Sequence, residues 1–175
     1  MKNSALILNI VLFQVTWLSA ALLSEVYAFI SLGFLLLTLG LSPLAKNTII
    51  KRIVIVVLLG VIMDSIMGYL GIYRYSETTL IPLFNIPIWL LIMWAGFACS
   101  LCLSLDWAVN KPAIFILLCA AFGPASYLIG VKLDIILILE SAMLYMAIAW
   151  ATWAACFLWL DKTVQVKLMG GQYEK

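Results

Sequence analysis

The stretch from Ile53 to Ile72, IVIVVLLGVIMDSIMGYLGI, decides the fold class of this chain. It is almost entirely apolar and has Asp64 near its middle, and a helix of about twenty apolar residues is long enough to cross a bilayer. A carboxylate at membrane depth costs roughly 2.5–3.5 kcal/mol on insertion scales, so such a group usually faces a bundle interior, a water-filled cavity or a partner. Asp64 is therefore the first candidate for a functional residue.

The composition of the whole chain predicts an integral membrane protein. Hydrophobic residues make up 66% of the sequence, charged residues 10%, and histidine is absent. We expect an all-α fold, a polytopic transmembrane bundle forming one domain over residues 1–160, with a short cytoplasmic tail over 161–175. The apolar stretches predict about six spans: Ser4 to Leu23, Val26 to Leu41, Ile53 to Ile72, Ile86 to Leu105, Ala113 to Val131, and Ile135 to Leu160.

The basic residues predict the orientation of these six spans. Positive charge in short loops marks the cytoplasmic side of a membrane protein. Only Arg74 and Lys132 fall on one side, which we expect to be the outer side, so both termini should be cytoplasmic. The small net charge of +2 does not indicate a nucleic-acid partner. The other side collects Lys2, Lys46, Lys51, Arg52, Lys111, Lys162, Lys167 and Lys175.

Glycines share a helix face with Asp64. Gly60, Asp64, Gly68 and Gly71 recur at spacings of four, four and three residues, which places them along one side of a helix. Small residues let helix backbones approach closely in lipid, so the three glycines are candidates for helix packing. Two interpretations stay open: Asp64 hydrogen-bonds to a neighbouring helix across this seam, or the same face lines a pocket for a ligand or a proton.

Glu140 is the second carboxylate within an apolar stretch. At about 1.5 Å rise per residue, Asp64 lies roughly 12 Å and Glu140 roughly 8 Å below the outer ends of their predicted spans. The two carboxylates could therefore share a cavity. Alternatively, Glu140 caps a helix that begins nearer to it, or extends to the membrane surface with Lys132. The catalytic residues are thus unknown, with Asp64 and Glu140 as candidates.

Four other side chains are candidates for substrate or lipid binding. Arg74, flanked by two tyrosines, could hold a lipid phosphate or a carboxylate, although an interfacial anchor is the alternative. Gln14 lies near the membrane midplane, where it either lines a cavity or bonds to another helix. Trp94 could stack on a ligand or simply pack. Tyr127 follows Pro124, whose missing N–H interrupts the helix as often happens beside binding sites.

Metal ions and cofactors are not expected. Cys99 and Cys102 form a CxxC motif, but it lies in an apolar helix without a second ligand pair for zinc or basic residues to stabilise a thiolate. The chain also lacks the motifs of familiar hydrolases and nucleotide-dependent enzymes.

Several blocks of the sequence resemble a bacterial inner-membrane family known as domain of unknown function 2878. The resemblance implies a bacterial inner-membrane location and no assigned activity. It also implies a link to lipids, because relatives are often encoded near fatty-acid-modifying enzymes, but it transfers no catalytic residue. The sixth span matches least clearly. The blocks are Leu8–Trp17, Gly60–Ser65, Gly71–Tyr75, Pro87–Leu90 with Met93–Ala98, and Gly123–Gly130.

Three classes of function are compatible with these features. We favour a protein that handles a lipid or small molecule in an intramembrane pocket around Asp64, as an enzyme or an enzyme's membrane partner. The first alternative is a transport subunit, because the size and topology are similar to the substrate-capturing subunits of energy-coupling-factor transporters. The second is a structural or assembly subunit. The expected partners are membrane lipids and either another membrane protein or a second copy of the chain.

Overall fold

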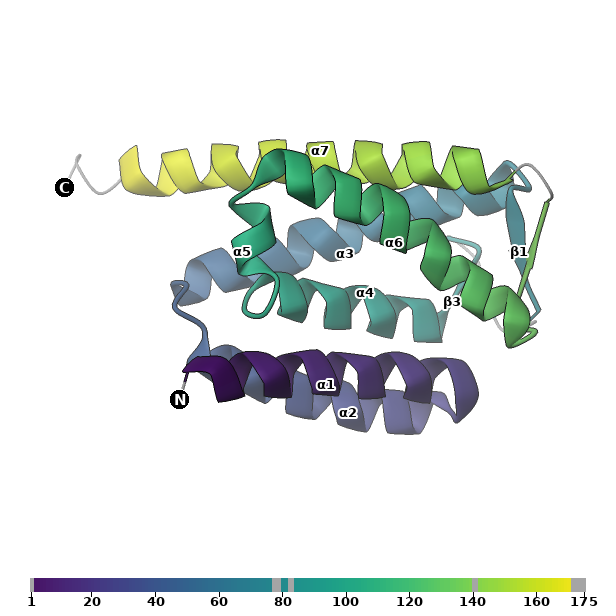
Figure 1. The fold of residues 1–175 in the computed structure, drawn as a ribbon, viewed down its shortest axis with the longest axis horizontal. Helices are drawn as coiled ribbons and strands as arrows, with labels where there is room; N and C mark the ends of the chain where they lie inside the picture. The colour runs from purple at the N-terminus through teal and green to yellow at the C-terminus, as the bar shows by residue number, and fades with distance from the viewer. Residues whose placement is uncertain (1, 77–79, 82–83, 140–141, 171–175) are drawn as a thin grey trace.

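The computed structural model describes residues 2–76, 80–81, 84–139 and 142–170, and these form a helical bundle (Figure 1). The predicted all-α fold class is confirmed, with four short strands added at one end. The α-helices are α1 (Lys2–Leu22), α2 (Glu25–Leu37), α3 (Lys46–Tyr69), α4 (Ile88–Leu101), α5 (Asp106–Val109), α6 (Pro112–Lys132) and α7 (Ala142–Gly170). A 3-10 helix, η1 (Thr38–Leu41), and the strands β1 (Tyr73–Tyr75), β2 (Leu80–Ile81), β3 (Ile86–Pro87) and β4 (Ile136–Ile138) complete the fold.

Three helices are long and apolar enough to cross a membrane. They cover Asn3–Leu22 in α1, Pro112–Lys132 in α6 and Ala142–Thr163 in α7. Two further apolar helices, Glu25–Leu41 and Ile88–Leu101, are shorter. Among the described residues, three helices are therefore long and apolar enough to span a membrane, where the sequence predicted about six spans.

The sixth predicted span begins later in the structure than in the prediction. Ile136–Ile138 forms β4, which pairs antiparallel with β1, and α7 starts only at Ala142. The chain turns after α6 at Asp134, whose φ is 58°, and the isoleucines that follow favour extended backbone. Glu140 lies outside the described residues. At the other end, α7 continues to Gly170, so the first ten residues of the predicted tail are helical.

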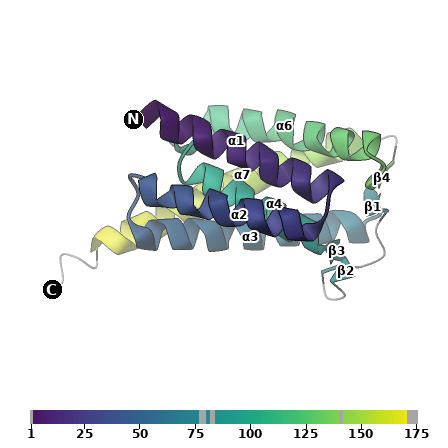
Figure 2. The same cartoon turned by 90° about the horizontal axis from the view of Figure 1, so that it is seen from below.

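Helix α4 occupies the centre of the bundle. It packs against α1, α2 and α3, while α1 pairs with α2, and α6 pairs with α7. The two views agree that the strands gather at one end and that α1 begins and α7 ends at the other (Figures 1 and 2). Nine of the 14 residues of α4 are buried. The backbone N–H and C=O groups at the ends of an enclosed helix can form hydrogen bonds with the surrounding protein. Such a helix can therefore be shorter than the thickness of a membrane.

The end of the bundle opposite the strands contains a buried ion cluster. Arg52 of α3, which the sequence analysis counted among the loop charges, is only 2% exposed. Its guanidinium donates two hydrogen bonds to Asp161 of α7, at 3.0 and 2.9 Å, and one to Asp106 of α5 at 2.6 Å. It also donates to the carbonyl oxygen of Leu101 at 3.0 Å. Arg52 therefore joins α3, α4, α5 and α7.

Candidate functional site

Asp64 lies at the centre of a buried hydrogen-bond cluster that joins four elements. Its side chain is fully buried. The hydroxyl of Tyr73 in β1 donates to Oδ1 at 2.5 Å, the hydroxyl of Tyr127 in α6 donates to the same oxygen, and the indole of Trp94 in α4 donates to Oδ2 at 2.6 Å. All three donors are neutral, and the hydrogen bonds of the described residues bring no cation to this carboxylate. The cluster fixes the orientation of Trp94 and Tyr127.

The glycine face of α3 explains how Trp94 reaches Asp64. A Cβ atom at Gly60 would lie 2.1 Å from Cδ2 of Trp94, so only a glycine lets the indole lie directly on this helix. At Gly68 a Cβ would meet its nearest neighbour, the amide nitrogen of Asn85, at an ordinary 3.8 Å. Gly71 lies beyond the end of α3 with a φ of 71° and no neighbour within 4 Å of a Cβ. Its role is to turn the chain, and the predicted helix packing applies at Gly60.

A second glycine holds a second tryptophan. The rings of Trp94 and Trp150 stack at 5.2 Å between centroids with 21° between their planes. A Cβ at Gly123 of α6 would lie 2.2 Å from Cδ2 of Trp150. The two stacked indoles, Trp94 of α4 and Trp150 of α7, therefore pack against Gly60 and Gly123, respectively. This arrangement gives Trp94 and Trp150 a fixed place between α3 and α6.

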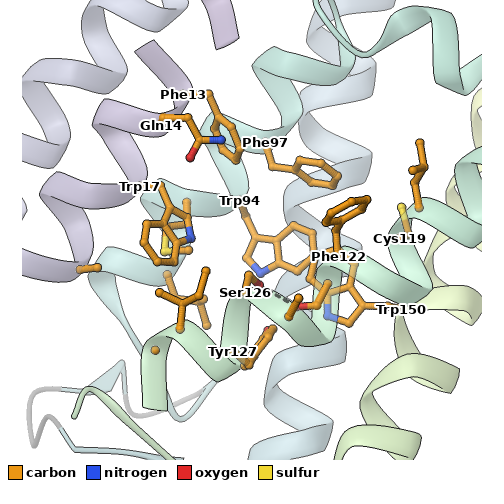
Figure 3. A pocket seen from close by; sticks show the side chains of 18 of the residues that line it. Phe13, Gln14, Trp17, Trp94, Phe97, Cys119, Phe122, Ser126, Tyr127 and Trp150 are labelled. Atoms are coloured by element: carbon orange, nitrogen blue, oxygen red, sulfur yellow. Dashed lines mark hydrogen bonds between the residues drawn. The ribbon is translucent and has the colours of Figure 1, made fainter. Parts of the chain in front are cut away.

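Beside this stack lies a cavity of about 590 Å³ between α1, α4 and α6 (Figure 3). Figure 3 shows Phe13, Gln14 and Trp17 of α1 on one side and Cys119 and Phe122 of α6 on the other. Trp94, Phe97, Tyr127 and Trp150 also line it, and no charged side chain is among the described residues that do so. An aromatic cavity of this volume is typical of a site for an apolar small molecule.

The structure places three of the predicted binding residues on the cavity wall, Asp64 directly behind that wall and Arg74 away from it, whereas Glu140 lies outside the described residues. Gln14, Trp94 and Tyr127 all line the cavity. Asp64 does not line it; it lies behind the wall, where it hydrogen-bonds to Trp94 and Tyr127. Arg74 is exposed on β1, in register with Leu137, and is not among the residues that line the cavity.

Some cavity residues were missed by the sequence analysis. Trp17 lies near the end of an apolar stretch, where a tryptophan usually belongs to the interfacial aromatic belt. Its spacing of three residues from Gln14 was the available signal, since residues three apart share a helix face. Phe97 and Phe122 carried no such signal, because an apolar aromatic residue in an apolar helix gives no indication of which side faces a cavity.

The side chains that line the cavity are better suited to binding a ligand than to catalysing a reaction. The described cavity residues include one thiol, Cys119, and one aliphatic hydroxyl, Ser126, which donates to the carbonyl oxygen of Gly123 at 2.6 Å. The phenol of Tyr127 and the indole N–H of Trp94 are already engaged by Asp64. In the described part of the chain, no group of three or more His, Cys, Asp or Glu residues is placed to hold a metal ion.

Comparisons with known proteins identify a family but no activity. The sequence model of a family described as "Protein of unknown function (DUF2878)" matches residues 6–159, which covers most of the chain. A search of curated proteins and a search of solved structures gave no significant match.

Proposed function

Because the chain belongs to the DUF2878 family, whose function is unknown, we propose a function from the geometry of the site itself. We propose that the protein resides in the bacterial inner membrane and binds a lipid or another small apolar molecule in the cavity between α1, α4 and α6. The observation that carries this proposal is the cavity: about 590 Å³, lined by aromatic side chains and free of charge among its described residues.

The proposed topology has six membrane-crossing segments: α1, α2 with η1, α3, α4, α6 and α7. Large apolar side chains on the outside of the bundle support it, since Leu37, Leu117 and Leu144 are 74%, 69% and 67% exposed. α3 is 24 residues long, enough at about 1.5 Å per residue to cross a bilayer core.

The distribution of basic residues supports cytoplasmic termini. Lys46 and Lys51 at the start of α3, Lys111 before α6 and Lys162 near the end of α7 all belong to the end of the bundle where α1 begins (Figure 1). Labelling of single cysteines introduced at Lys111 and Lys132 in intact cells tests this orientation. A membrane-impermeant thiol reagent should label position 132 and not position 111.

Asp64 serves this function as a positioning residue. A molecule in the cavity meets Trp94 and Tyr127, and Asp64 holds both of them from behind through hydrogen bonds. The sequence predicted a pocket around Asp64 itself. In this proposal the ligand site is instead the neighbouring cavity, and Trp94 and Tyr127 lie between it and Asp64. The proposal therefore gives the carboxylate no contact with the ligand.

A matched pair of substitutions on α6 tests whether the cavity holds a lipid. Ala125 lines the cavity, whereas Ala121, one helical turn earlier, is exposed and is not among the lining residues. We expect Ala125→Trp to fill the cavity and Ala121→Trp to leave it open. The wild-type protein, extracted from membranes in mild detergent, should release a bound apolar species detectable by mass spectrometry. Ala125→Trp should lose most of that species and Ala121→Trp should retain it.

The same experiment can contradict the proposal. If all three proteins release identical lipids in identical amounts, the cavity does not retain a ligand and the binding function is wrong. Co-purification of the wild-type protein with an ATPase complex would instead favour the transport alternative. Both results require that the two variants elute as folded protein on size-exclusion chromatography.

A further inference from the structure

The polar groups that line the cavity are unevenly satisfied, and this indicates which ligand the cavity fits. Trp94 and Tyr127 donate to Asp64, and Ser126 donates to the carbonyl oxygen of Gly123. On the opposite side, the amide of Gln14 and the indole N–H of Trp17 make no hydrogen bond within the described part of the chain, and both residues line the cavity (Figure 3). The indole N–H groups of Trp89, Trp107 and Trp150, which also line the cavity, likewise make no hydrogen bond within that part of the chain, and that of Trp150 is buried. Gln14 and Trp17 are the pair of available groups that lie three residues apart on one helix, α1.

Two fully buried polar side chains of the same helix do have hydrogen-bond partners. Asn9 donates to Oγ1 of Thr38 at 2.8 Å and accepts a hydrogen bond from Ser104 at 2.6 Å. Thr16 donates to the carbonyl oxygen of Leu12 at 2.8 Å. Both residues are fully buried, whereas Gln14 is exposed on the cavity side of the helix. An amide in an apolar environment without a partner is unfavourable, so a partner supplied by a ligand would stabilise it.

The absence of charged lining residues restricts the ligand further. An ionised group placed among apolar and aromatic side chains would have no countercharge from the described residues of the wall. A purely hydrocarbon ligand, in turn, would leave Gln14 and Trp17 without partners. The chemistry that fits both conditions is an uncharged molecule with one hydrogen-bond-accepting oxygen.

We propose that the ligand is an uncharged lipid with a carbonyl group, such as an acyl ester, whose oxygen accepts hydrogen bonds from the Gln14 amide and the Trp17 indole. The hydrocarbon part lies among Phe97, Phe122 and the stacked Trp94. This inference rests on the proposed binding function and specifies the chemical class of the ligand.

Binding can be measured with a quenching probe in nanodiscs. The methyl ester of dibromostearic acid carries bromine, which quenches nearby tryptophans, and the cavity is lined by several of them. Three unbrominated competitors of equal chain length distinguish the ligand classes: methyl palmitate, hexadecane and hexadecyl phosphate. We expect methyl palmitate to compete about five- to tenfold more strongly than hexadecane, because it gains one or two hydrogen bonds. Hexadecyl phosphate should compete at least tenfold more weakly than methyl palmitate.

Two variants assign the hydrogen bonds to residues. Gln14→Leu removes the amide at nearly constant size, and Trp17→Phe removes the indole N–H but keeps an aromatic ring. Each substitution should weaken the competition by methyl palmitate about three- to tenfold and leave the competition by hexadecane unchanged. Trp159→Phe is the matched control, since Trp159 is 67% exposed on α7 and is not among the lining residues. It should change neither competitor.

The outcomes separate this inference from the function on which it rests. Lipid-exposed Trp159 is quenched in every variant that retains it, so binding is read from the additional quenching. If the brominated ester quenches the wild type more strongly than Ala125→Trp, the cavity binds it. Equal competition by methyl palmitate and hexadecane, or equal losses for both in the Gln14 and Trp17 variants, would then overturn the carbonyl assignment alone. Stronger competition by hexadecyl phosphate would do the same in favour of a charged lipid. Equal quenching of the wild type and Ala125→Trp would overturn both proposals.

Discussion

Two buried clusters of this protein, one around Arg52 and one around Asp64, stabilise their central charged groups in different ways. At the end where α1 begins, Arg52 is neutralised by two carboxylates, Asp106 and Asp161, and also donates to a backbone carbonyl. Toward the strand end, Asp64 accepts hydrogen bonds from three neutral side chains, all of which are themselves largely apolar rings. The first cluster is an ion network, and the second uses aromatic donors.

Of the two clusters, only the one around Asp64 contributes side chains to the lining of the cavity. An ion network orients charged side chains, which would be unfavourable in an apolar binding site. The Asp64 cluster instead orients Trp94 and Tyr127, whose rings then present apolar surface to the cavity. We infer that Arg52 mainly holds helices together, whereas Asp64 holds the shape of a binding surface. Four substitutions, from the largest expected effect to the smallest, test this distinction.

Replacing Arg52 with methionine should have the largest effect on stability. It removes the guanidinium shared by Asp106 and Asp161 and leaves buried carboxylate charge, so we expect a loss of about 3–5 kcal/mol. Unfolding in mixed detergent micelles measures it. Lys51→Met is the control, because Lys51 is the exposed neighbour on the same helix. Equal stability of the two variants would show that the ion network contributes nothing.

Asp64→Asn should lower the free energy of unfolding by less, about 1–3 kcal/mol. The amide oxygen can still accept from Tyr73 and Tyr127, but the amide nitrogen would face the indole N–H of Trp94, so two donors would oppose each other. The effect should shrink when Trp94→Phe has already removed that N–H, and a double-mutant cycle measures this coupling. Ser65→Ala is the control, since the Ser65 hydroxyl has no partner among the described residues. Additive effects of the two substitutions would contradict the proposed contact.

Gly60→Ala should disturb the cavity wall from the other face of Trp94. The added methyl group would overlap the indole, and such overpacking costs about 1–3 kcal/mol, partly offset by up to ~1 kcal/mol of helix propensity. We expect a net loss of about 1–2 kcal/mol and a shift in the Trp fluorescence spectrum. Gly68→Ala, with ordinary contact distances, should be neutral or slightly stabilising. If Gly68→Ala were less stable than Gly60→Ala, the packing of Trp94 on Gly60 would be contradicted.

Arg74→Ala should have the smallest effect. Its side chain is exposed on β1, so we expect a change within about 0.5 kcal/mol and no change in the retained lipid. Mass spectrometry of the purified variant checks the second expectation. If the variant lost the bound species, the result would instead support the prediction from the sequence that Arg74 binds a lipid headgroup.

The sequence alone predicted the helical class and the importance of several residues. Local apolar length accounts for the helices, and the cost of burying polar groups drew attention to Asp64 and Gln14. The spacing of small residues along one helix face drew attention to Gly60. Sequence analysis did not predict the β1–β4 pairing, because the pairing of strand residues 61 to 65 positions apart depends on where α6 ends. It also did not predict that Arg52 is buried, because a basic residue beside an apolar stretch usually belongs to a loop.

Only the tertiary structure decided what the polar residues do. Asp64 meets Trp94 and Tyr127, 30 and 63 residues away, because α3 lies beside α4 and α6 turns its tyrosine towards them. Hydropathy is a local property and gives no information about helix neighbours in an apolar solvent, where most apolar faces are equally acceptable. The sequence therefore determined that a buried carboxylate needs partners. The packing of the helices determined which partners it has, and placed the cavity on their far side.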